Sequence, residues 1–155
     1  MPRRSTRLEA EGAEFLVLGN LLIHGIPAYK TYTNMPGYDV IAVNPGKSPA
    51  TARISVKSRW DTGATGFLIR NYDCDFVVVA KLNRGSSKNP ENVKPPEFYV
   101  LPIAVVKRAR SPIGWGRIEF GKVKLFKGYL NRWDLVRALL AKSQGVGKAK
   151  KKNAP

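Results

Sequence analysis

Residues 37–58, with the sequence GYDVIAVNPGKSPATARISVKS, contain two strand-like stretches joined by a turn. Residues 38–43 and 51–57 favour strands, and the Asn, Pro and Gly residues between them favour a tight connection. Side chains alternate along a strand, so Ile54 and Val56 share one face while Ser55 and Lys57 share the other. The short connection predicts that these two strands pair in antiparallel fashion.

The sequence on either side predicts further helices and strands. A helix is expected over residues 7–24, because Thr6 and Glu9 have the spacing of a capping box and Gly25 and Pro27 follow. Apolar side chains surround most of this helix, which predicts that it is largely buried. Residues 75–82 are β-branched and predict a central strand. The other predictions are an extended segment at 28–33, a short segment at 66–70 that extends the sheet, a strand at 98–101, a helix near 102–107, a hairpin or irregular edge over 108–128, and a helix at 132–143.

The order of these elements predicts an α/β fold with a mixed sheet, because a helix and several strands with tight early connections precede the later helices. A length of 155 residues fits one domain, which we place at residues 5–143. Residues 144–155 contain four lysines and little apolar sequence, so we expect a disordered basic tail.

Charge and cysteine content indicate the kind of partner and compartment. The chain has 27 Lys and Arg residues against 11 Asp and Glu residues, a net charge of +16, which favours a polyanionic partner, chiefly nucleic acid. Its single cysteine, Cys74, fits a reducing compartment. Three glutamates interrupt the N-terminal region where a signal peptide would lie, and no run of about 18 apolar residues exists. We therefore expect an intracellular, cytoplasmic protein that does not insert into membranes.

Three polar positions have residue types that could perform chemistry. Glu14 projects toward the apolar part of the first helix, Asp39 begins a predicted strand, and Lys57 shares a strand face with Ser55. Each has an ordinary interpretation taken alone: a helix-start acid, a residue that closes a turn, and a solvated strand lysine. Their order and spacing make the combination more informative than any one of them.

The sequence MPGYD at 35–39, followed about 18 residues later by Ser55-Val56-Lys57 and preceded by a helix that contains Glu14, resembles the PD-(D/E)XK nuclease superfamily. The resemblance covers residues 10–82. Within the superfamily, this part of the chain resembles the restriction-enzyme-like and Holliday-resolvase-like members. It implies a restriction-endonuclease-like core, in which helices flank a mixed central sheet.

The resemblance also implies roles for the site residues. Glu14, Asp39 and Lys57 would be catalytic, and Asp39 and Glu14 would hold Mg²⁺ or Mn²⁺. Phosphodiester hydrolysis needs a nucleophilic water and neutralisation of phosphate charge, both of which a cation held by few carboxylates supplies. Lys57 would orient the water or stabilise developing charge. Ser55 stands where the superfamily usually has an acid, so its role stays open, and Asp61, Asp73 and Asp75 are further candidate ligands.

The expected function is a metal-dependent endonuclease that hydrolyses DNA phosphodiester bonds. An alternative is a catalytically inactive nucleic-acid-binding module on the same fold, and a third is a basic structural protein in which the motif match is accidental. DNA versus RNA, specificity and oligomeric state remain open, with a homodimer as one option. The residues expected to contact nucleic acid, through their charge or through stacking on bases, are Arg59, Trp60, Arg70, Arg108, Arg110, Lys122 and Lys124.

Overall fold

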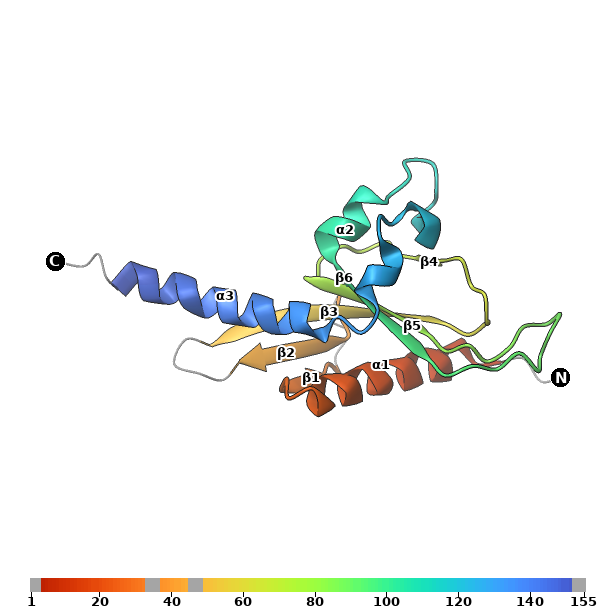
Figure 1. Ribbon diagram of the computed structural model, residues 1–155, viewed down its shortest axis with the longest axis horizontal. Helices are drawn as coiled ribbons and strands as arrows, with labels where there is room; N and C mark the ends of the chain where they lie inside the picture. The colour runs from red at the N-terminus through yellow and green to blue at the C-terminus, as the bar shows by residue number, and fades with distance from the viewer. Residues whose placement is uncertain (1–3, 33–36, 45–48, 152–155) are drawn as a thin grey trace.

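The computed structural model describes residues 4–32, 37–44 and 49–151 (Figure 1). Its first half contains helix α1 (Thr6–Ile23) and strands β1 (Ala28–Lys30), β2 (Val40–Asn44), β3 (Ala50–Arg59) and β4 (Gly66–Leu68). Its second half contains β5 (Phe76–Lys81), β6 (Glu97–Pro102), α2 (Ile103–Arg108), β7 (Arg117–Glu119), the 3-10 helices η1 (Phe120–Lys122) and η2 (Phe126–Tyr129), and α3 (Trp133–Lys151).

The main sheet has five strands in the order β1-β2-β3-β5-β6. Strands β3 and β5 pair in parallel, and the other neighbours pair in antiparallel fashion. The β-branched run of β5 lies between β3 and β6, where its side chains are buried on both faces of the sheet. This arrangement confirms the predicted α/β fold with a mixed sheet flanked by helices.

Each face of the sheet has its own hydrophobic core. On one face, α1 and α3 pack over Ile54, Val56 and Val78. On the other face, α2 and β7 pack over Val77 and Val79. Figure 1 shows the sheet between α1 below and α2 above. The predicted alternation in β3 is therefore real: Ile54 and Val56 face the helices α1 and α3, and Ser55 and Lys57 point to the opposite side.

Two predictions about strands and helix ends are wrong. Strand β4 does not extend the main sheet but pairs with β7 in a separate two-stranded sheet. Gly66 permits this close pairing, because a Cβ there would lie 2.4 Å from the Ile118 carbonyl oxygen. The N-cap of α1 is Ser5 rather than Thr6, and the Ser5 Oγ accepts from the Leu8 N–H.

The C-terminal helix is longer than predicted. The backbone of α3 continues to Lys151 instead of ending near residue 143, so the first part of the predicted basic tail is helical. Lysine and alanine are good helix formers, which offsets the glycines at 145 and 147. The remainder of the predicted tail, residues 152–155, lies outside the described residues, as does most of the predicted connection between residues 43 and 51.

The prediction that the first helix is largely buried is also wrong. Only Ala13, Val17 and Leu21 of α1 are buried. The apolar side chains on the far side of the helix stay exposed because no other described segment covers that side, and they are Leu8, Phe15, Leu16, Leu22 and Ile23. Among the described residues, no helix is both long and apolar enough to cross a bilayer.

Candidate active site

Asp39 is held at the start of β2 by a glycine turn. Gly37 has a φ of +95°, and a Cβ at this position would lie 2.6 Å from the Asp73 carbonyl oxygen. Only glycine adopts that backbone conformation with so little space around it. The turn therefore packs against the segment before β5 and places Asp39 beside β3.

The contacts of Asp39 fix its backbone and one side of its carboxylate. Its N–H donates to the Ile54 carbonyl over 2.8 Å, which extends the β2–β3 ladder by one residue. Its Oδ2 accepts from the Val56 N–H over 2.7 Å. The other oxygen, Oδ1, accepts no hydrogen bond from the described residues. Asp39 thus presents an oriented carboxylate with one oxygen available for a further ligand.

Ser55 and Lys57 lie across from Asp39 on β3. Val40 pairs with Ile54, and Asp39 contacts the backbone on either side of Ser55, at the Ile54 carbonyl and the Val56 N–H. Ser55 is buried at 3% exposure, and Lys57 is half-buried. Within the described part of the chain, no carboxylate forms an ion pair with Lys57. The predicted face therefore presents a carboxylate, a small hydroxyl and a cation without an ion-pair partner.

Glu14 comes from α1, which covers the face of the sheet opposite Ser55 and Lys57, and it contacts a lysine that the sequence interpretation missed. The Lys30 Nζ on β1 lies 3.0 Å from Glu14 Oε2 and 3.2 Å from Glu11 Oε1. The same Nζ lies 5.2 Å from the centre of the Phe15 ring and 5.1 Å from that of Tyr32. Lys30 is therefore enclosed by two carboxylates and two aromatic faces.

The Glu14 carboxyl lies within electrostatic reach of Asp39. Burial raises the pKa of Glu14 above its ordinary value, and the negative charge of Asp39 raises it further. The hydrogen bond from Lys30 opposes these effects but does not cancel them. The same ion pair raises the pKa of Lys30, chiefly through the hydrogen bond to Glu14. The negative charge of Asp39 disfavours ionisation of Glu14, and a bound cation would relieve that repulsion.

The side chains at this site fit a cation with few protein ligands. Within the described residues, no group of three or more His, Cys, Asp and Glu side chains could hold a metal ion. Mg²⁺ commonly binds through one or two carboxylates and takes its other ligands from water and phosphate. Glu14 and Asp39 supply that minimum, provided that Lys30 releases Glu14.

The other predicted acidic candidates have different roles. Asp73 and Asp75 both bind Arg53, with an Asp73 Oδ1 to Arg53 Nη1 distance of 2.6 Å. Asp75 Oδ2 also accepts from the Arg53 N–H, as expected for a residue that begins a strand. Asp61 is exposed in the turn after β3. Asp73 and Asp75 therefore connect the segment before β5 to β3.

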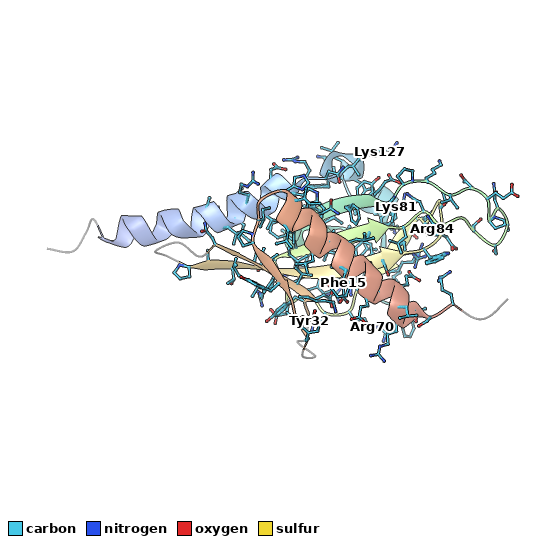
Figure 2. All side chains as sticks on the ribbon, turned by 90° about the horizontal axis from the view of Figure 1, so that it is seen from below. Phe15, Tyr32, Arg70, Lys81, Arg84 and Lys127 are labelled. Carbon is cyan, nitrogen blue, oxygen red and sulfur yellow. The ribbon has the colours of Figure 1, made fainter. Side chains whose placement is uncertain are left out.

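The structure separates the predicted nucleic-acid contacts into three places. Arg108, Lys122 and Lys124 line one hollow between α2 and the 3-10 helices. Arg70 is exposed at the edge of the molecule opposite Lys127 (Figure 2), and Arg110 lies over the Tyr72 ring at 5.5 Å. Arg59 and Trp60 lie at the end of β3, where Arg4 covers the Trp60 ring at 4.6 Å.

An exposed aromatic residue adds to this basic surface. Trp115 lies between α2 and β7 and is 92% exposed. The basic residues Arg110 and Arg117 flank it in the sequence. An exposed indole among arginines is suited to stacking on a nucleic-acid base.

Comparison with known proteins supports the fold. No protein-family model and no curated protein matches this sequence. Among solved structures, the chain is similar to a bacterial homing endonuclease, I-Ssp6803I, at 22% sequence identity and a TM-score of 0.60. The match covers 97% of this chain and 100% of the other. At this identity the likeness shows a shared fold, and it supports the mixed α/β architecture expected from the sequence.

Removing the Lys30 cation should change how metal affinity depends on pH. Lys30→Met removes the hydrogen bond and charge that lower the pKa of Glu14, so this pKa rises further. A cation binds the ionised carboxylate, so the pH at which Mg²⁺ affinity is half-maximal should shift upward. Well above that pH, the variant should bind Mg²⁺ more tightly than wild type, because Lys30 no longer competes for Glu14.

Calorimetric Mg²⁺ titrations over a pH series measure this effect, and the two affinity curves should cross. Lys30→Arg retains the cation and should follow wild type. Parallel curves for Lys30→Met and wild type would show that Glu14 takes no part in metal binding.

Proposed function

We propose that this protein is a metal-dependent endonuclease that hydrolyses DNA phosphodiester bonds. The observation that carries the proposal is that Asp39 lies within electrostatic reach of Glu14 and hydrogen-bonds to β3, the strand that contains Lys57. The fold shared with a homing endonuclease supports the same conclusion. The resemblance of the sequence to the PD-(D/E)XK motifs also supports the proposal.

Each side chain has a distinct part in the proposed reaction. A bound Mg²⁺ or Mn²⁺ would activate water and neutralise phosphate charge. Asp39 would hold the cation, and the Val56 N–H donates to its Oδ2 and so fixes the direction of the carboxylate. Glu14 would provide the second carboxylate if Lys30 moved away from it. Lys57 would donate hydrogen bonds to the scissile phosphate as negative charge develops on its oxygens.

The surface around the site is suited to a nucleic acid. The segment before β5 packs against Gly37 and pairs with Arg53 through Asp73. Arg70 lies in this segment, and Arg110 lies over its Tyr72 ring. Cations at these positions can contact phosphates on either side of the scissile bond. The exposed Trp115 adds a stacking surface, and the hollow with Arg108, Lys122 and Lys124 extends the positive charge farther from the site.

A second candidate function is a nucleic-acid-binding module without catalysis. Two observations favour it: Ser55 is neutral and buried, and Lys30 already compensates the charge of Glu14. In that case Lys30 would be a permanent replacement for the metal. The two functions share the basic surface and differ in metal dependence.

A plasmid-cutting assay separates the two candidates. With Mg²⁺ or Mn²⁺ we expect supercoiled DNA to become nicked or linear, and with EDTA we expect no cutting. DNA that is bound but never cut, whichever metal is present, would support the inactive module.

Replacing Ser55 with an acid should couple protein stability to the metal. Ser55→Glu places a carboxylate in a buried position, which costs several kcal/mol without a compensating cation. The variant should therefore unfold at lower temperature in EDTA and recover with Mg²⁺, by a larger shift than wild type. Thermal unfolding with and without Mg²⁺ measures this, with Ser55→Gln as the neutral control. A Ser55→Glu protein that is insensitive to Mg²⁺ would show that position 55 does not face the cation.

A further inference from the structure

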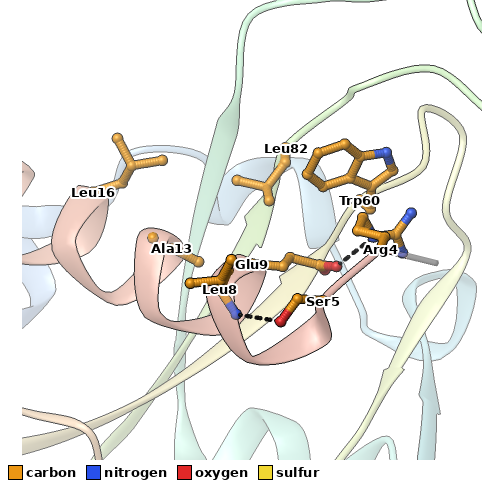
Figure 3. Close-up of a pocket in the computed structure, with 9 residues that line it drawn as sticks. Arg4, Ser5, Leu8, Glu9, Ala13, Leu16, Trp60 and Leu82 are labelled. Carbon is orange, nitrogen blue, oxygen red and sulfur yellow. Dashed lines mark hydrogen bonds and ion pairs between the residues drawn. The ribbon is translucent and has the colours of Figure 1, made fainter. Parts of the chain in front are cut away.

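The connection between α2 and β7 carries two exposed apolar side chains. Ile113 is 84% exposed and Trp115 is 92% exposed. Figure 1 shows the chain after α2 projecting at the top of the molecule. The two other tryptophans are covered: Trp133 is buried, and Trp60 forms one wall of a groove beside α1, with Arg4 over its ring (Figure 3). Trp115 exposes almost its whole indole, so both faces of its ring are free to contact a ligand.

A tight turn holds the indole at the end of this connection, which we call the Trp115 loop (residues 110–117). The Arg117 N–H donates to the Gly114 carbonyl over 2.7 Å, which makes Trp115 and Gly116 the central residues of the turn. Their φ values are +50° and +83°, both positive, as in a type I′ turn. Asn and Gly are the residues preferred in such turns, and a bulky aromatic residue there is strained. Strain of this kind is typical of functional positions.

The Trp115 loop is fixed to the segment that supports the candidate site. A Cβ at Gly116 would lie 2.5 Å from the Ile69 carbonyl oxygen, and the Ile69 N–H donates to the Gly116 carbonyl over 2.8 Å. Farther along this segment, the Asp73 carbonyl packs against the glycine turn before β2. Strand β7, which follows the loop, packs over Val79, and Val79 pairs with Lys57 in the parallel β3–β5 ladder. The base of the loop therefore lies on the same side of the sheet as Lys57.

The charge around the Trp115 loop favours a polyanion as its ligand. Residues 98–118 contain four cations and no acid. Lys107, Arg108 and Arg110 are exposed, so they can contact phosphates on either side of the loop. An anionic membrane would also attract these cations. Nucleic acid is favoured over a membrane because the loop lies on the side of the sheet that carries Lys57, where one duplex can contact both.

We propose that Trp115 and Ile113 form a wedge that enters a base step of duplex DNA, separates the two base pairs and kinks the duplex. The inference rests on the proposed function only for its partner, DNA, and it needs no metal. A base stacked on a single-strand platform covers one face of an aromatic ring, whereas insertion between two base pairs covers both faces, which Trp115 leaves free. Apolar wedges of this kind kink a duplex by about 20–90°. Pyrimidine–purine steps such as TA unstack easily, so the wedge should prefer them.

Energy transfer between dyes at the two ends of a duplex of about 25 base pairs tests the wedge, because a kink brings the ends closer together. One duplex contains several TA steps, and the other is an A-tract, which is stiff. In EDTA, which prevents cutting, wild type and Trp115→Phe should raise the energy transfer of the TA duplex more than that of the A-tract. Trp115→Asn should bind both duplexes without this rise, and its affinity should be about tenfold weaker, the loss expected for one aromatic–base stack.

Two controls separate the wedge from a loss of folding or of exposed apolar surface. Asn adopts positive φ more readily than Trp, so Trp115→Asn should unfold at the same temperature as wild type or higher. Ile113→Asn should reduce the kink, whereas Ile23→Asn should not, because Ile23 is equally exposed at 84% but lies on α1.

The possible results distinguish this inference from the proposed function. An equal rise in energy transfer with Trp115→Asn and wild type would overturn the wedge alone. DNA that is kinked in EDTA but never cut with Mg²⁺ would overturn the proposed function alone. Binding of neither duplex would overturn both. Phosphatidylserine vesicles are the alternative ligand: an emission shift with vesicles that Trp115→Phe removes, without any kink in DNA, would assign the loop to a membrane instead.

Discussion

Asp39→Asn should abolish DNA cleavage while leaving the fold intact. The amide retains an oxygen that can accept from the Val56 N–H, so the local β2–β3 geometry survives. It loses the negative charge that binds the cation, and metal-dependent stabilisation of the transition state is worth several kcal/mol. We therefore expect cleavage to fall by at least about a hundredfold.

Single-turnover cleavage with Mg²⁺, together with circular dichroism, measures this effect. Asp134→Asn is the matched control, because it also removes one carboxylate but lies on α3, where Asp134 pairs with Arg132. The control should cut as wild type does. Equal cleavage rates for Asp39→Asn and wild type would mean that the site lies elsewhere.

Lys57→Met should also eliminate cleavage, but without weakening the protein. Lys57 is half-buried and pairs with no carboxylate in the described part of the chain. Replacing such a cation with an apolar side chain removes a desolvation cost, so thermal stability should stay the same or rise. Loss of a hydrogen-bond donor to the developing phosphate charge should lower the cleavage rate by about a hundredfold or more.

Single-turnover rates at saturating DNA and Mg²⁺ separate this effect from substrate binding. Lys88→Met removes the same charge from an exposed loop position and should cut like wild type. Lys57→Met that cuts normally, or that unfolds at a much lower temperature than wild type, would assign Lys57 a structural role instead.

Local patterns in the sequence predicted the centre of the fold and the strand positions of the candidate residues Asp39, Ser55 and Lys57. The alternation around Ile54 and Val56 placed Ser55 and Lys57 on the opposite face, and the structure has that arrangement. The glycine turn before Asp39 likewise indicated a residue at the start of a strand. These features depend on neighbours within a few residues, so the sequence alone contains them.

Features that depend on distant contacts could not be predicted in this way. The pairing of β4 with β7 joins segments about 50 residues apart, and no turn signal connects them. Lys30 is an ordinary strand lysine in the sequence, and only the packing of β1 against α1 brings it to Glu14. The exposed side of α1 was mistaken for core because burial depends on what covers a helix. The sequence did contain one indication of this contact. Glu11 and Glu14 lie one helical turn apart, where a single cation can pair with both carboxylates.

The central claim is that one cation binds between Asp39 and Glu14 and beside the scissile phosphate. A crystal structure of the wild-type protein with duplex DNA and Mn²⁺, with the metal located by anomalous scattering, tests it most directly. We predict a peak about 2.0–2.6 Å from Asp39 Oδ1, with Glu14 released from Lys30 and Lys57 Nζ facing the phosphate. A peak bound only by other carboxylates, such as Asp73 and Asp75, with Lys30 still paired to Glu14, would contradict the account.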